Sequence, residues 1–122
     1  NDLQIVVTAT LLNALYLRDG NIVLATRTAD HLLISGGRRA NWFAVVDGHI
    51  THSSLSLIKG ETYDSIQRLV RAIVHLKELV PSAAINILKG RLAELRHALG
   101  PAQFDAHYER SIKANMQPAS AL

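Results

Sequence analysis

The clearest hydrophobic pattern in the chain lies in residues 61–100, where apolar residues recur at intervals of three and four on both sides of Pro81. This spacing returns side chains to one face of a helix, so each half of the segment should bury one side. The apolar positions are Ile66, Leu69, Ile73, Leu76 and Val80 in the first half and Ile85, Leu88, Leu92, Leu95 and Leu99 in the second. We therefore predict a helical hairpin whose first helix stops at Pro81 and whose second stops at Gly100.

A shorter apolar pattern follows in residues 102–115, where Phe104, Tyr108 and Ile112 recur at intervals of four. This predicts a third, modestly amphipathic helix. Gly90 falls inside the second predicted helix, where glycine costs about 1 kcal/mol relative to alanine and is tolerated if a neighbour packs closely against it. Residues 117–122 are small and uncharged, and we expect them to form a frayed C-terminal tail.

The first half of the chain favours strands, because its apolar and β-branched residues come in short runs between turn signals. Asp19-Gly20 and Asp47-Gly48 are the residue pairs that tight hairpin turns prefer. For residues 9–17 we favour a strand that forms a hairpin across Asp19-Gly20, which needs a bend or bulge near residues 10–13; a short helix is the alternative. The remaining strands are predicted over residues 3–8, 22–26, 31–35, 42–46 and 49–53.

Together these patterns predict one α+β domain over residues 1–116. An antiparallel β meander of four or five strands would be packed by two long amphipathic helices plus a shorter third helix. The chain has 122 residues and 48% hydrophobic content, which is enough for a single core. It contains no uncharged apolar run of about 18 residues, the length of a membrane span, and it contains no cysteine. We expect a cytoplasmic protein without disulfides or thiolate chemistry.

Pairing of strands across the Asp47-Gly48 turn leaves apolar side chains on both faces of the predicted hairpin. Phe43, Val45 and Ile50 lie on one face, while Trp42, Ala44 and Val46 lie on the other. Because the helices can cover only one face, we expect a second copy of the chain to cover the other. A homodimer with Trp42, Ala44 and Val46 at its interface is therefore predicted.

Two adjacent arginines, Arg38 and Arg39, follow Gly36-Gly37 in a predicted loop. Paired guanidinium groups on a loop are candidates for contact with an anion, and the alternative is that both are solvated at a hairpin tip. The loop lacks the Lys-Ser/Thr pair of a P-loop, which excludes that kind of nucleotide site.

His49 and His52 form an H-x-x-H pair in a predicted strand. This spacing puts two imidazoles on one side of a helix but on opposite faces of a strand, so we expect no metal site. They remain candidate ligand-binding residues. A pocket between sheet and helices would be lined by His31, by His49 or His52, and by Arg38.

The basic charge is concentrated in the predicted helices. The net charge is +3, and residues 62–122 hold eight basic and five acidic residues. Such a surface either contacts phosphates or is simply solvated. A nucleic-acid-binding protein would use Arg38, Arg39 and this helical half. The turn at Gly100-Pro101 loosely fits a helix-turn-helix, with Gln103, His107, Arg110 and Lys113 exposed on its second helix.

The sequence shows no catalytic constellation. Most acidic residues fall at turns or on polar helix faces, there is no Gly-x-Ser-x-Gly nucleophile motif, and no cofactor is expected. The leading hypothesis is a small non-enzymatic binding or interaction module that forms a homodimer. The alternatives are a basic regulator that binds nucleic acid, and a small-molecule binder or enzyme with the pocket described above.

Overall fold

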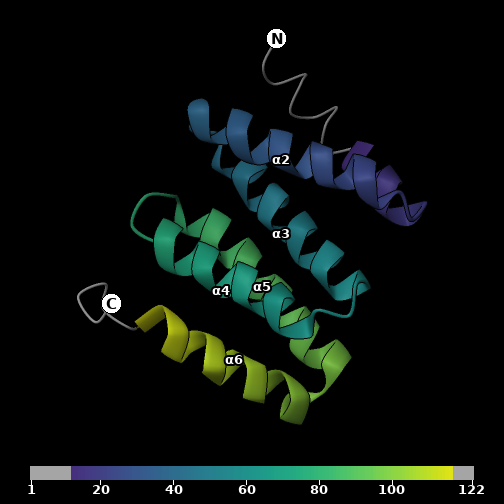
Figure 1. Ribbon diagram of the computed structural model, residues 1–122. Helices are drawn as coiled ribbons and strands as arrows, with labels where there is room; N and C mark the ends of the chain where they lie inside the picture. The colour runs from purple at the N-terminus through teal and green to yellow at the C-terminus, as the bar shows by residue number, and fades with distance from the viewer. Residues whose placement is uncertain (1–11, 117–122) are drawn as a thin grey trace.

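The computed structural model describes residues 12–116, and this part of the chain is helical and contains no strand (Figure 1). The predicted α+β fold is therefore wrong, because the residues expected to form a β meander form helices instead. Residues 12–18 are helical and precede five longer helices: α2 (Ile22–Arg38), α3 (Trp42–Ile58), α4 (Thr62–Leu76), α5 (Ser82–Leu99) and α6 (Pro101–Met116).

Signals that end and begin helices recur every 20 residues, since α2, α3, α4 and α5 begin at residues 22, 42, 62 and 82. The side-chain oxygens of Asn21 and Asn41 accept hydrogen bonds from the backbone N–H groups of Leu24 and Ala44, at 3.2 and 3.3 Å. Each asparagine thereby satisfies one N–H that the first turn leaves unpaired. The residues just before these starts adopt positive φ, at Gly20 (73°), Ala40 (52°) and Gly60 (79°).

The two aspartate-glycine pairs have roles that differ from hairpin turns. Gly20 does adopt the positive φ expected of it, but it ends a helix rather than joining two strands. Gly48 lies in the middle of α3, where a Cβ atom would come within 2.9 Å of Leu33 Cγ and 3.0 Å of the Ala29 carbonyl oxygen. Glycine at position 48 therefore lets α2 and α3 approach closely.

The helices are arranged as a stack with α2 at one edge and α6 at the other (Figure 1). α2 packs against α3, α3 packs against α4 and α5, and α6 packs against both helices of the α4–α5 hairpin. The main core lies between α3, α4, α5 and α6, and Leu32 of α2 forms a smaller cluster with Ala44 of α3. The main core is formed by Val46, Ile66, Leu69, Val70, Ala72, Ala84, Ile85, Leu88, Leu92, Leu95 and Phe104.

The prediction of three helices after residue 61 is confirmed, and most of the predicted apolar positions of α4 and α5 are buried. α4 ends at Leu76 rather than at Val80, so the last turn of the predicted first helix is absent. No neighbour outside the helix backbone lies within 4 Å of a Cβ at Gly90, so the close packing invoked there is not found. Residues 12–18 bear out the short-helix alternative, whereas the strand at 3–8 and the tail at 117–122 lie outside the described residues.

None of the helices between residues 12 and 116 is long and apolar enough to cross a membrane.

Candidate anion-binding groove

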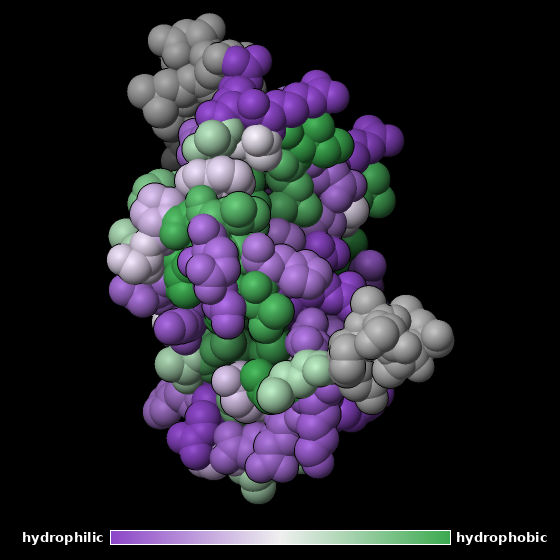
Figure 2. Space-filling view, turned by 90° about the vertical axis from the view of Figure 1, so that its left-hand side faces the viewer, coloured by the Kyte–Doolittle hydropathy of each residue, from purple (hydrophilic) through white to green (hydrophobic). Residues whose placement is uncertain are grey.

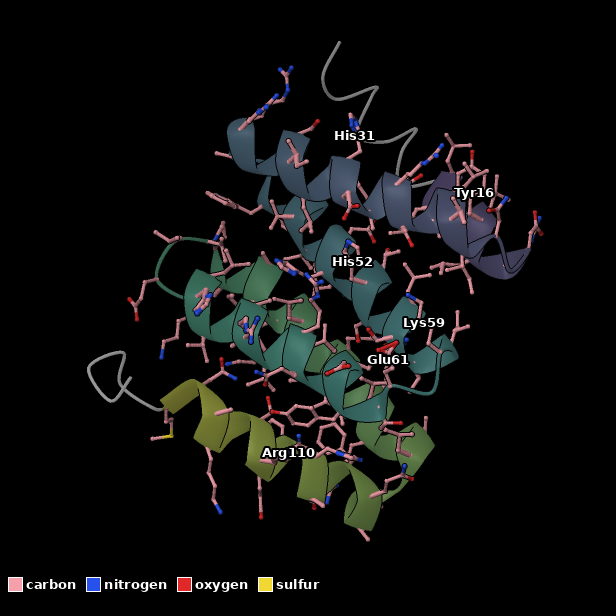
Figure 3. All side chains as sticks on the ribbon, viewed as in Figure 1. Tyr16, His31, His52, Lys59, Glu61 and Arg110 are labelled. Atoms are coloured by element: carbon pink, nitrogen blue, oxygen red, sulfur yellow. The ribbon has the colours of Figure 1, made fainter. Side chains whose placement is uncertain are left out.

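A groove with a volume of about 510 Å³ runs along the seam between α3 and α4. Charged and polar side chains dominate its lining, and nitrogen-bearing side chains gather along this seam in Figure 3. The residues that line it are His49 and Ser56 from α3 and Asp64, Gln67, Arg68, Arg71, Ala72, His75 and Leu76 from α4.

One end of the groove is cationic. Arg68, Arg71 and His75 follow one another at intervals of three and four along α4, so they share one face of that helix. His49 reaches the same groove from α3. Arg68 is half-buried, while Arg71 and His75 are exposed.

Neither Arg68 nor Arg71 forms a salt bridge with a carboxylate in the described part of the chain. The pKa of Arg68 is lowered from its ordinary value by burial and by the nearby charge of Arg71, and the negative charge of Asp30 opposes this shift in part. In contrast, Arg91 pairs with Glu94 at 2.9 Å and Arg96 pairs with Asp105 at 3.0 Å. The two arginines of the groove are therefore without a salt bridge among the described residues, and Asp30 compensates the charge of Arg68 only in part.

The surroundings of the two histidines of α3 lower the pKa of each. Burial lowers the pKa of His49 to about 4, and the charges on Arg68 and His52 act in the same direction. Its Nδ1 atom is buried and has no hydrogen-bond partner among the described residues. The pKa of His52 is also lowered, by burial and by Arg68, although its Nε2 lies 2.8 Å from the Asp30 carboxylate, which opposes the shift.

The other end of the groove carries neutral and acidic hydrogen-bonding groups, namely Ser56, Gln67 and Asp64. Gln67 is oriented by α6, because its Oε1 accepts hydrogen bonds from Ser111 Oγ and, at 3.0 Å, from Asn115 Nδ2. Because the side-chain carbonyl of Gln67 is hydrogen-bonded to α6, its amide Nε2 is the group that can donate a hydrogen bond to a ligand in the groove. The charged groups of the groove thus change sign along its length, from Asp64 at one end to Arg71 at the other.

The structure changes the interpretation of the H-x-x-H pair. Because α3 is a helix, His49 and His52 lie on one side of it rather than on opposite faces of a strand. Each nevertheless has its own surroundings, since His49 lines the groove while His52 contacts Asp30 of α2. Among residues 12–116, no group of three or more histidine, aspartate or glutamate side chains is placed to hold a metal ion.

Arg38 and Arg39 lie at the end of α2 and are exposed, outside the residues that line the groove. His31 lies on the outer side of α2, with Nε2 3.5 Å from Ser35 Oγ (Figure 3). The expected pocket between sheet and helices has no counterpart, because the described residues contain no sheet. Of its predicted lining residues, His49 alone lines the α3–α4 groove.

The residues predicted for a dimer interface belong largely to the interior of the chain. Ala44 and Val46 are buried, with 2% and 1% of their surface exposed, and Trp42 packs against the main core. Surface apolar residues are found elsewhere, for example at Val23 and Leu79, and Figure 2 shows apolar side chains exposed between polar ones on one face. A homodimer stays a prediction, and it would have to use other residues than Ala44 and Val46.

The α6 residues considered for nucleic acid are partly engaged with α4. The Arg110 guanidinium lies 3.8 Å from the centre of the Tyr63 ring, and the His107 ring centre lies 6.2 Å from the same ring. Gln103 and Lys113 are exposed.

No family model matches the chain, and no curated protein or solved structure is significantly similar to it. The groove must therefore be interpreted from its own chemistry. Arg68 and Arg71 belong to the basic helical half described from the sequence, but neither they nor His75 were predicted as site residues. The spacing of positions 68, 71 and 75 places these three residues on one helix face. A helix in place of the predicted strand at His49 would have placed His49 near them.

Proposed function

We propose that this protein is a small binding module that holds an anionic ligand in the groove between α3 and α4. The observation that carries the proposal is the half-buried Arg68, which lies beside Arg71 without a salt bridge to any described carboxylate. A charge taken partly out of water costs free energy unless an opposite charge compensates it. An anion between the two arginines would supply that compensation.

The chemistry of the groove suits a compact oxyanion. Arginine presents several N–H donors in a planar fork, and the phosphate and carboxylate groups are its best-matched acceptors. His75 is exposed at the same end and adds a third nitrogen group from the same helix face. A cytoplasmic location, expected from the sequence, agrees with this proposal but stays a prediction.

A small anion is favoured over a nucleic-acid duplex. A duplex is contacted mainly through its phosphates by side chains that project from the surface. Here Arg68 is recessed, and Arg110, which a helix-turn-helix would use, stacks on Tyr63 of α4. An anion that neutralises the recessed Arg68 must be small enough to enter the groove.

The proposal is tested by isothermal titration calorimetry with inorganic phosphate on the wild type and on two variants that each lose one positive charge. In Arg71→Gln a charge-assisted interaction is removed, and we expect binding to weaken roughly 10- to 150-fold, since such bonds contribute roughly 1.5–3 kcal/mol. Arg27→Gln is the matched control, because Arg27 is exposed on α2 and does not line the groove.

Absence of phosphate binding by the wild type, or equal weakening in both variants, would contradict the proposal. A parallel titration with duplex DNA at several salt concentrations tests the alternative. The nucleic-acid hypothesis would be favoured instead if the duplex binds, if its affinity falls steeply with salt, and if phosphate in the groove does not change this binding.

A further inference from the structure

We infer that the ligand of this groove is a phosphomonoester that carries hydroxyl groups, as a sugar phosphate does, with its phosphate at the Arg71–His75 end and its hydroxyl groups at the Asp64–Ser56 end. This inference rests on the proposed function and specifies the ligand of the same groove.

The inference follows from the polarity of the groove along its length. Asp64 lies in the first turn of α4 and Arg71 two helical turns further on, a rise of roughly 10 Å. Because α3 and α4 are consecutive and joined by a short turn, Ser56 near the end of α3 lies beside the start of α4, and His49 lies beside its second half. A bare phosphate can occupy one end only, whereas a phosphate with a sugar attached spans both.

Asp64 fixes the orientation of such a ligand. A carboxylate repels a phosphate but accepts hydrogen bonds from hydroxyl groups, so the phosphate belongs at the opposite end. No described basic residue forms a salt bridge with Asp64, and its side chain is exposed in the groove. Ser56 and the Nε2 group of Gln67 add neutral donors beside it.

The dimensions and composition of the groove agree with a ligand of this size. Its volume of about 510 Å³ lies within the range of roughly 300–1,000 Å³ that is usual for small-molecule sites. The apolar residues that line the phosphate end are the buried Ala72 and the half-buried Leu76.

The test compares four ligands by calorimetry on the full chain: inorganic phosphate, glucose 6-phosphate, phosphoethanolamine and glucose. We expect the wild type to bind glucose 6-phosphate about tenfold more tightly than phosphate and to bind glucose hardly at all. In Asp64→Asn this preference should largely disappear, while the affinity for phosphate stays the same or rises slightly because a repelling charge is gone. The matched control is Glu109→Gln, an exposed acidic residue of α6 outside the groove, which should keep the preference.

Asparagine at position 64 keeps a polar group in the first turn of α4, and circular dichroism verifies that the variant folds. Ser56→Ala is a smaller change at the same end of the groove. It should also weaken the preference for glucose 6-phosphate over phosphate. Equal affinity for the two phosphates, no effect of Asp64→Asn, or tighter binding of phosphoethanolamine than of glucose 6-phosphate would overturn this inference alone. Failure of phosphate itself to bind would overturn the proposed function together with it.

Discussion

At the scale of single residues, the half-buried His49 should make the stability of the protein depend on pH. Its pKa is about 4 in the folded chain and about 6.5 in an unfolded one. Between these values the unfolded state binds more protons, so the free energy of unfolding must fall as the pH is lowered from 7. After an allowance for the part of the ring that water still reaches, the loss between pH 7 and pH 5 should be roughly 1–2 kcal/mol.

The measurement is urea denaturation of the wild type and of His49→Gln at both pH values. The variant has no titrating group at this position, so its stability should change less with pH than that of the wild type. His52, whose pKa is lowered as well, remains in both proteins and cancels in the comparison. Identical losses in the two proteins would show that His49 does not carry the effect.

His49 also shows what the sequence could and could not predict of the site. The residue was identified as a candidate ligand contact, and it does line the groove. Its partners were missed, because a strand at this position turns successive side chains to opposite faces and directs none of them toward Arg68. A candidate residue can be chosen by its type, but its neighbours depend on the secondary structure assigned to it.

At the scale of elements, α3 explains why half of the fold was predicted wrongly. The helix is rich in β-branched residues and contains Asp47-Gly48, and apolar residues occur on all its sides. A surface helix shows an apolar stripe at a period of 3.6 residues, as α4 does, whereas a helix packed on several sides does not. α3 contacts α2 on one side and α4 and α5 on others, so its pattern resembles that of a covered sheet. Tertiary packing overrode the local preference.

Two glycine-to-alanine substitutions should have opposite effects on stability. A methyl group at Gly48 would meet Leu33 and the Ala29 carbonyl at about 3 Å, so Gly48→Ala must push α2 away from α3 and should cost about 1–3 kcal/mol. Gly90 lies in α5 with nothing within 4 Å of such a methyl group, and Gly90→Ala should stabilise the protein by about 0.5–1 kcal/mol. Thermal and urea unfolding of the two variants would measure both. Stabilisation by Gly48→Ala would show that the helices are not in close contact at this point.

At the scale of the whole molecule, the order of the stack sets which part opens first. Among α2 to α6, α2 packs only against α3, while α4 and α5 are embedded in the main core. Segments with fewer buried contacts open at lower free energy. Native-state hydrogen exchange should therefore show that amides of α2 exchange at least about tenfold faster than those of α4 and α5.

Two fully buried leucines provide matched variants: Leu32→Ala should accelerate exchange in α2 alone, whereas Leu88→Ala should accelerate it in every helix. If Leu32→Ala accelerated exchange equally in α5, the stack would unfold as one unit.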